Sequence, residues 1–421
     1  MQFFMKNKLT VLSIPILFIL PWISYLISLI NLKSRISAFI FIFFAGFFGY
    51  SIGFTNTSVD SYRYAEAFMR FERPDSYLSI IQMYLDGELR DIYRNSLFYI
   101  VSFFSRSANV VYALAGLIYG SLAYLSLRIY IYERGSQTNR YTLVLALIFI
   151  TYCSLSNINA FNFNTAALLA FCSTYNLIIK NKKIWLIGIF LTPLMHYSFA
   201  LFIPVILILK LGMPFTYNSV KVNTIVFYVF IVTFILSFFL STNLFDISFI
   251  SRLDILPGGI TNRIDYVNSD DVSEIVENRV GNSLFLKVLS YFNNLISFYV
   301  LIVVLYINKY IKNNNTGGFV EINMLFTFVL LYYSFAHIAI SFPSGSRFMA
   351  IGHMFLVLLL SRFYRIYNTD KIKRLIFIAL LPFMFNILFI NIVMPIMILT
   401  PTFWYGGFVG VLLENLGSIK G

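Results

Sequence analysis

The sequence has few charged residues for its length. Only 12% of its 421 residues are Asp, Glu, Lys or Arg, whereas 59% are hydrophobic. A soluble domain carries about 25% charged residues. The mean hydropathy is +0.79. Such a chain has too little polar surface to cover its apolar residues in water, so the composition argues against a soluble fold and predicts a membrane protein.

Cysteines and nucleotide-binding motifs are also scarce. The two cysteines, Cys153 and Cys172, fall inside apolar runs, which favours core packing over a disulfide framework or a metal pair. The sequence has no Gly-x-x-x-x-Gly-Lys phosphate loop and no dinucleotide fingerprint. It also lacks the basic and aromatic modules of nucleic-acid binders. We therefore predict no cofactor, no metal, no nucleic-acid partner and no cytosolic nucleotide-driven chemistry.

Long apolar runs dominate what is present. Many reach or approach the roughly 20 residues that cross a bilayer as a helix. They lack the alternation that a barrel needs, and lipid requires every backbone group to bond within the segment. We predict an all-α polytopic integral membrane protein in which residues 1–421 form a single membrane domain. We expect about 12 spans (range 10–13) at 9–30, 36–54, 109–130, 141–155, 160–179, 184–195, 197–209, 222–241, 284–308, 319–342, 346–361 and 372–399.

These spans leave two long loops, 55–108 and 242–283. If both are extracytoplasmic, the cytoplasmic loops hold about 17 cations against three acids, Glu133, Glu321 and Asp370. This imbalance accounts for the whole net charge of +13 and is the positive-inside pattern. The basic balance is therefore a topology signal, with some attraction to anionic membrane lipid. The same charges place both termini outside.

Acids and histidines gather on the predicted outer side. About 15 of the 18 acids fall there, and so do His196, His337 and His353. Ionisable groups at membrane depth cost roughly 2.5–3.5 kcal/mol on insertion scales and are candidates for function. Histidine can move protons near neutral pH, although a lone histidine more often bonds at a helix end. An enzyme working outside has no routine nucleotide supply, so it would need a lipid-linked donor.

The first long loop carries Asp60, Arg63, Tyr64 and Phe68. Asp60, Tyr64 and Phe68 follow the i, i+4, i+8 spacing of one helical face, which predicts an amphipathic helix. Such a helix can simply lie on the membrane. Alternatively, its tyrosine stacks on a sugar while its carboxylate binds sugar hydroxyls. A second mixed-charge stretch, residues 86–94, is expected to be a solvated face.

Arginines are the other outer feature. Arg252, Arg263 and Arg279 come from the second long loop, and Arg347 from a short outer turn. The arginine fork suits a diphosphate, because it forms two parallel charge-assisted bonds and never deprotonates. Surface pairing with nearby aspartates is the alternative. Both interpretations stay open for Arg263, while surface pairing is favoured for Arg252 and Arg279.

Four short segments together resemble the Wzy / EpsG-like family of bacterial polysaccharide (O-antigen) polymerases. They span roughly residues 60–350 and read Asp60-x-x-x-Tyr64, Met195-His196-Tyr197-Ser198, Asn262-Arg263-Ile264-Asp265-Tyr266 and Ser346-Arg347-Phe348. The resemblance has departures. Relatives often carry an arginine within the segment 157–164, where this chain has asparagines, and the family usually places its termini inside.

The resemblance implies a GT-C-like architecture and a reaction at the outer face of the bacterial inner membrane. A growing glycan would move from undecaprenyl diphosphate to a lipid-linked repeat unit, without metal or cofactor, and a chain-length regulator protein would be a partner. The candidate catalytic residues are His196 and Asp60. The candidate substrate-binding residues are Arg63, Tyr64, Arg263, Tyr266, Arg279 and Arg347. A transporter or flippase for lipid-linked oligosaccharide and an O-antigen ligase remain alternatives.

Overall fold

The computed structural model describes residues 11, 13–89, 91–136, 138–216, 220–239, 284–313, 320–340 and 345–418. Within these ranges the chain is helical and forms no named strand; an isolated antiparallel bridge joins Ile52 to Leu399. The all-α prediction is confirmed. The loop 242–283 lies outside the described residues, and with it the candidate residues Arg263, Tyr266 and Arg279.

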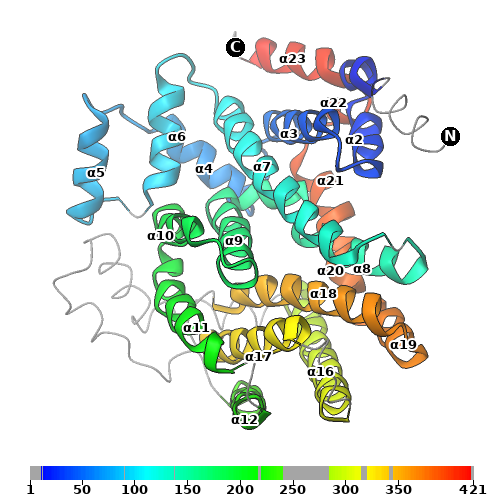
Figure 1. The fold of residues 1–421 in the computed structure, drawn as a ribbon. Helices are drawn as coiled ribbons and strands as arrows, with labels where there is room; N and C mark the ends of the chain where they lie inside the picture. Colours follow the sequence, from blue (N-terminus) through cyan, green and yellow to red (C-terminus); the bar gives the residue numbers. More distant parts are fainter. Residues whose placement is uncertain are drawn as a thin grey trace.

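The first part of the chain packs against one long helix, α7. Its helices are α2 (Pro21–Ile30), α3 (Arg35–Tyr50), α4 (Asp60–Met69), α5 (Tyr77–Leu85), α6 (Ile92–Ser102) and α7 (Ala108–Arg134). The predicted amphipathic helix of the first long loop is α4, and two further helices, α5 and α6, complete that loop. Figure 1 shows α4, α5 and α6 together on the left, beside the beginning of α7.

The rest of the chain adds the other helices of the bundle, and its last helices return to α3: Phe403 stacks on Phe47 at 5.5 Å, and Asn415 donates to the Tyr50 carbonyl at 3.3 Å. Its helices begin with α8 (Arg140–Tyr152), the 3₁₀ turn η1 (Leu155–Ala160), α9 (Phe161–Thr174), the π-helical turn η2 (Tyr175–Ile179), η3 (Lys183–Trp185), α10 (Leu186–Met195), η4 (Tyr197–Ala200), α11 (Phe202–Thr216) and α12 (Val220–Leu236). They continue with α16 (Leu284–Asn313), α17 (Val320–Ala339), η6 (Gly345–Arg347), α18 (Phe348–Tyr367), α19 (Asp370–Ile378), α20 (Leu380–Leu388), η7 (Phe389–Val393), α21 (Met394–Ile398), α22 (Thr402–Tyr405) and α23 (Gly407–Ser418).

Six helical stretches of the described residues are long and apolar enough to cross a membrane. They are Ala108–Arg134, Arg140–Ile179, Lys287–Lys312, Ile322–Ala339, Phe348–Tyr367 and Asp370–Ile398. Shorter apolar helices accompany them at Pro21–Ile30, Arg35–Tyr50, Lys183–Met195, Tyr197–Gly212 and Thr224–Leu236. This pattern is that of a multi-pass membrane protein. The count of twelve spans stays a prediction.

The stretch Arg140–Ile179 runs along α7 twice, as the two predicted spans 141–155 and 160–179 require. Helix α8 is antiparallel to α7, because Tyr130 donates to the Thr142 carbonyl at 2.7 Å near the start of α8, and Tyr119 donates to the Ser154 carbonyl at 2.9 Å just after its end. Helix α9 then runs parallel to α7, and η2 lies beside the C-terminal end of α7, where the Tyr175 hydroxyl donates to the Glu133 carboxylate. The chain therefore reverses at η1, and α9 begins beside the start of α7.

Glycines allow α3 and α7 to pack with their backbones in contact. A Cβ atom at Gly49 would lie 2.0 Å from the Tyr112 carbonyl oxygen, and one at Gly116 would lie 2.3 Å from the Ala45 carbonyl oxygen. Small residues at helix interfaces are typical of membrane bundles, because close packing replaces the hydrophobic effect there. These glycines hold the first part of the chain onto α7.

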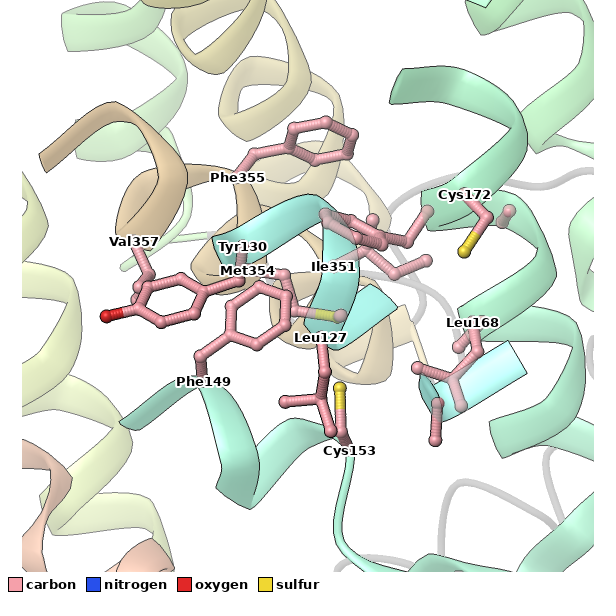
Figure 2. Packing of buried hydrophobic residues seen from close by; sticks show 14 of the residues in the cluster. Leu127, Tyr130, Phe149, Cys153, Leu168, Cys172, Ile351, Met354, Phe355 and Val357 are labelled. Carbon is pink, nitrogen blue, oxygen red and sulfur yellow. The ribbon is translucent and has the colours of Figure 1, made fainter. Parts of the chain in front are cut away.

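The centre of the bundle is an apolar core between α7, α8, α9 and α18 (Figure 2). The Phe149 ring stacks on Tyr130 at a centroid distance of 5.0 Å and meets Phe171 at 5.7 Å. Phe171 in turn packs on Phe355 at 4.8 Å. Cys153 and Cys172 are buried in this core as free thiols, as the sequence predicted. This core fixes α9 and α18 side by side, so both begin at the same end of the bundle.

Candidate functional site

The first turn of α9 forms a platform made of Phe161, Asn162 and Phe163. The asparagines on either side fix it: Asn164 donates to the Asn157 carbonyl at 2.7 Å, and Asn157 donates to the Tyr152 carbonyl at 3.3 Å. These bonds satisfy carbonyls that would otherwise lose their partners where α8 ends. We call Phe161–Asn162–Phe163 the platform, because its three side chains contact residues of α4, α6 and η6.

Helix α4 docks beside the platform. The Ser61 amide donates to the Asn159 side-chain oxygen at 2.9 Å, which gives a partner to one amide of the first turn of α4. One turn further on, the Tyr64 ring meets Phe161 edge-to-face at 5.1 Å. Phe68 is buried and packs on Phe98 of α6 at 5.1 Å. The face predicted from the Asp60, Tyr64 and Phe68 spacing therefore points into the protein, toward α6 and α9.

Helix α6 docks through the middle residue of the platform. Asp91, at the N-cap of α6, accepts a 3.1 Å bond from the Asn162 side-chain amide. Tyr93 packs on Phe161 at 5.8 Å, and the Arg94 guanidinium lies 5.4 Å from the Tyr64 ring centre. The sequence predicted a solvated face here. That prediction is wrong for these residues, because Asp91 is buried and the Arg94 Nε atom is buried too.

Arg347 reaches the platform from the opposite side, at the end of η6. Its guanidinium lies 5.2 Å from the Phe163 ring centre, while its side chain stays exposed. The next residue, Phe348, packs on Phe163 at 6.4 Å and on Phe199 at 5.2 Å. The turn is tight, since a Cβ atom at Gly345 would lie 1.6 Å from the carbonyl oxygen of the last residue of α17. Glycine is therefore required for this turn to close and present Arg347.

Four charged groups act on the Tyr64 hydroxyl. Burial raises the pKa of Tyr64 above its usual range, and the Asp60 and Asp91 carboxylates raise it further. Arg94 and Arg347 oppose them. Tyr64 therefore stays protonated at neutral pH and can donate a hydrogen bond. Two carboxylates and two guanidinium groups thus act electrostatically on one hydroxyl.

His196 lies on the Arg347 side of the platform. Its ring meets Phe163 edge-to-face at 5.2 Å. Its Nδ1 atom lies 2.8 Å from the Ser198 hydroxyl and accepts from the Ser198 amide at 3.4 Å. An Nδ1 atom that accepts a backbone N–H carries no proton, so the neutral ring is protonated at Nε2. In this arrangement His196 caps η4, and its accepting nitrogen is already occupied.

Asp60 and Arg63 form an ion pair on α4. The pair is open to solvent: the Asp60 side chain keeps 25% of its exposed area and the Arg63 side chain 60%. Asp60 is the first residue of its helix, where a carboxylate is favoured by the helix dipole. Of the two candidate bases, Asp60 is therefore the one whose oxygen atoms remain accessible to a substrate hydroxyl.

The structure thus brings together the candidate residues that it describes. Tyr64, His196 and Arg347 contact the platform, and Asp60 and Arg63 lie on the same helix as Tyr64. Within the described residues no three His, Cys, Asp or Glu side chains gather in a metal-binding arrangement, and metal-independent chemistry stays a prediction. The sequence reasoning missed the platform itself. The signal available was the Phe-Asn-Phe run at a predicted span start.

A second polar cluster lies at the other end of α7 and was also missed. Arg362 of α18 makes a forked ion pair with Glu133 of α7, with 2.6 Å from Nε to Oε2 and 2.7 Å from Nη2 to Oε1. Both side chains are buried, at 1% and 0% exposure. Tyr175 donates to the same carboxylate. The sequence analysis had counted both charges as separate cytoplasmic residues.

No protein-family model, no curated protein and no solved structure matches this chain.

Proposed function

We propose that this protein is a polysaccharide polymerase of the O-antigen type. It would span the bacterial inner membrane about twelve times in a GT-C-like arrangement and act at the outer face. Its substrate would be an undecaprenyl-diphosphate-linked oligosaccharide, and a chain-length regulator protein would be a partner. The observation that carries the proposal is the gathering of Asp60, Tyr64 and Arg347 around one platform, because these are the residues that carry the family resemblance.

The placement of charge supports an outer position for this site. The opposite end of α7 carries residues of the predicted cytoplasmic loops: Lys180 lies 3.9 Å from the Tyr132 ring centre, and Arg365 donates to the Tyr132 carbonyl. Because α7 runs from the platform to this cationic end, the positive-inside rule would put the platform outside. An enzyme there depends on a donor that the membrane itself delivers.

In the proposed reaction an acceptor hydroxyl attacks the anomeric carbon of the growing glycan. The new glycosidic C–O bond forms as the bond from that carbon to the diphosphate breaks, and undecaprenyl diphosphate leaves with the electron pair. Arg347 would stabilise the negative charge that develops on the leaving group, together with Arg263 outside the described residues. Tyr64, kept protonated, would position a sugar by donating a hydrogen bond.

The hydroxyl proton needs a base, and the geometry favours Asp60 over His196. His196 uses its accepting nitrogen to cap η4, whereas the Asp60 carboxylate is accessible beside Tyr64. Arg63 pairs with Asp60 at the solvent side of α4. A general base must lie within hydrogen-bond reach of the proton it removes, and an exposed carboxylate at the platform edge meets that requirement.

Polymer length in a strain that carries single substitutions tests the proposal. We expect Arg347→Lys to lose long chains, because the charge is kept while the fork is lost; about 10–100-fold less long polymer corresponds to one charge-assisted bond. Arg70→Lys is the matched control, since Arg70 is exposed and paired with Glu66 on the same outer segment. Unchanged chain length in Arg347→Lys contradicts the assignment.

Gel banding also separates the other candidate functions. Loss of a polymerase leaves single repeat units, whereas loss of a ligase leaves polymer that is not attached to a lipid core. A transporter is favoured by one observation: His337 and His353 are buried in the bundle, and ionisable residues there are typical of substrate or proton paths. A transporter mutant would accumulate lipid-linked units on the cytoplasmic side, which distinguishes it from a polymerase mutant.

A further inference from the structure

Four polar side chains lie together inside the bundle, on α8, α17 and α18. They are Tyr152, Tyr333, His337 and His353, and we call them the buried cluster. Tyr333 and the two histidines are at most 8% exposed, so bulk solvent does not reach them. The Tyr152 hydroxyl and the Nδ1 atom of His353 share a hydrogen bond at 2.9 Å. One histidine of the buried cluster therefore has its partner within the protein.

Two other polar atoms of the buried cluster have no such partner. The Tyr333 hydroxyl and the Nδ1 atom of His337 make no hydrogen bond with the residues that the structure describes. The two residues are one turn apart on the same face of α17, with their ring centres 6.0 Å apart. By contrast, the hydroxyl of Tyr332 donates to the Phe348 carbonyl at 3.1 Å. Buried polar atoms of native proteins nearly always bond to protein or to ordered water, so this pair requires a partner of its own.

A glycine of α18 fixes where the Tyr333 hydroxyl lies. A Cβ atom at Gly352 would lie 3.1 Å from Cε1 and 3.2 Å from Cζ of Tyr333. Because Cζ carries the hydroxyl, the polar end of this side chain lies against the backbone of α18, next to His353. The ring centres of Tyr333 and His353 are 6.0 Å apart. Tyr333 therefore lies between the two histidines, at the same distance from each ring.

The surroundings of the two histidines favour a neutral partner. The rings of Phe230 and Phe234 on α12 lie 5.5 Å and 5.4 Å from the His337 ring, and Phe383 of α20 lies 5.5 Å from the His353 ring. Among the described residues, no carboxylate, lysine or arginine acts electrostatically on either histidine. An ion would be costly to bury here without a counter-charge. Water carries no charge, accepts from a hydroxyl and donates to an imidazole nitrogen.

We propose that Tyr333 and His337 bind one internal water molecule. The water accepts a hydrogen bond from the Tyr333 hydroxyl and donates one to Nδ1 of His337. This bond fixes the neutral His337 ring in the form that is protonated at Nε2. A buried water typically makes about three hydrogen bonds, and His353 lies beside Tyr333 to offer a further one. The inference requires only the helical membrane bundle and does not depend on the proposed function.

The direction of the stability change in Tyr333→Phe tests the site in the purified full-length protein in nanodiscs. If water is bound, the substitution removes one hydrogen bond, and Tm should fall by about 2 °C. If the hydroxyl is unpaired, its removal relieves a buried polar atom of its missing partner, and Tm should stay the same or rise. The matched control is Tyr332→Phe, which removes a hydroxyl bonded to the protein and should lower Tm. A Tm for Tyr333→Phe at or above that of the wild-type protein refutes the site.

X-ray hydroxyl-radical footprinting in isotopically labelled water distinguishes bound water from a protein partner. Radicals inside a membrane protein form from water molecules held there, so a buried side chain is oxidised where water lies beside it. We expect labelled oxygen on Tyr333 and His337, and much less on Tyr332, which is equally buried but bonded to a carbonyl. If Tyr333 and His337 are oxidised no more than Tyr332, another part of the chain supplies the partner and the water site is refuted.

Discussion

Substituting Glu133 by Gln should destabilise the bundle strongly. The change removes the negative charge but keeps the size of the side chain, so Arg362 stays buried at 1% exposure with no counter-charge on α7. Tyr175 also loses its charged acceptor. Breaking a buried pair by removing one partner costs roughly 3–5 kcal/mol, because the remaining charge is uncompensated. In large chains each kcal/mol of lost stability lowers Tm by about 2 °C or more, so Tm should fall by about 6–10 °C.

Thermal unfolding of the purified protein in detergent measures this directly. The matched control is Asp370→Asn, because Asp370 and Lys373 also form a salt bridge, with the Asp370 side chain 84% exposed. Exposed ion pairs contribute little to stability, so the Tm of that variant should equal the Tm of the wild-type protein. The comparison isolates burial as the cause, since each substitution replaces a carboxylate by an amide.

A double variant gives the sharpest check of the reasoning. Replacing both partners, as Glu133→Leu with Arg362→Met, removes both buried charges and should recover most of the lost stability, as apolar replacements of buried pairs do. If the Tm of the double variant is as low as that of Glu133→Gln, charge imbalance is not the cause of the lost stability. A wild-type Tm for Glu133→Gln would contradict the burial of the pair altogether.

Other perturbations have defined outcomes. Gly116→Val should cost about 1–3 kcal/mol by overpacking α7 against α3, whereas Gly212→Val, with nothing within 4 Å of its Cβ position, should leave Tm unchanged. Asn162→Ala should cost roughly 1.5–3 kcal/mol, since it removes a bond to a buried carboxylate. Gly345→Ala should shorten the polymer by displacing Arg347, and equal chain length would contradict the tight turn.

Much of the fold could be predicted because lipid restricts the backbone to helices. Composition alone gave the all-α membrane class, and the spacing of Asp60, Tyr64 and Phe68 gave α4 within a loop. The break between the predicted spans 184–195 and 197–209 was also visible: α10 ends at Met195, and a separate 3₁₀ turn follows. What hydropathy could not give was which helices touch, since that depends on small residues such as those between α3 and α7.

The candidate site was only half predictable for a related reason. The charge asymmetry predicted that Asp60, His196 and Arg347 lie on one side of the membrane, but a side of a bilayer is far larger than a site. Contacts with the aromatic rings of the first turn of α9 hold Tyr64, His196 and Arg347 there, and the bond from the Ser61 amide to Asn159 places the start of α4, with Asp60, beside them. Arg94 was misjudged because the charges beside it in sequence suggested solvent, whereas its guanidinium lies over Tyr64 of α4 and Phe98 of its own helix.

The asparagines before and within the platform explain why cations come from neighbouring elements. The side chains of Asn157, Asn159 and Asn162 bond to a carbonyl, an amide and a carboxylate of other segments. A neutral amide can donate and accept at once, so it can join helices at a site where an arginine would demand a buried counter-charge. Substituting Asn159 should therefore loosen α4 without removing any charge from the site.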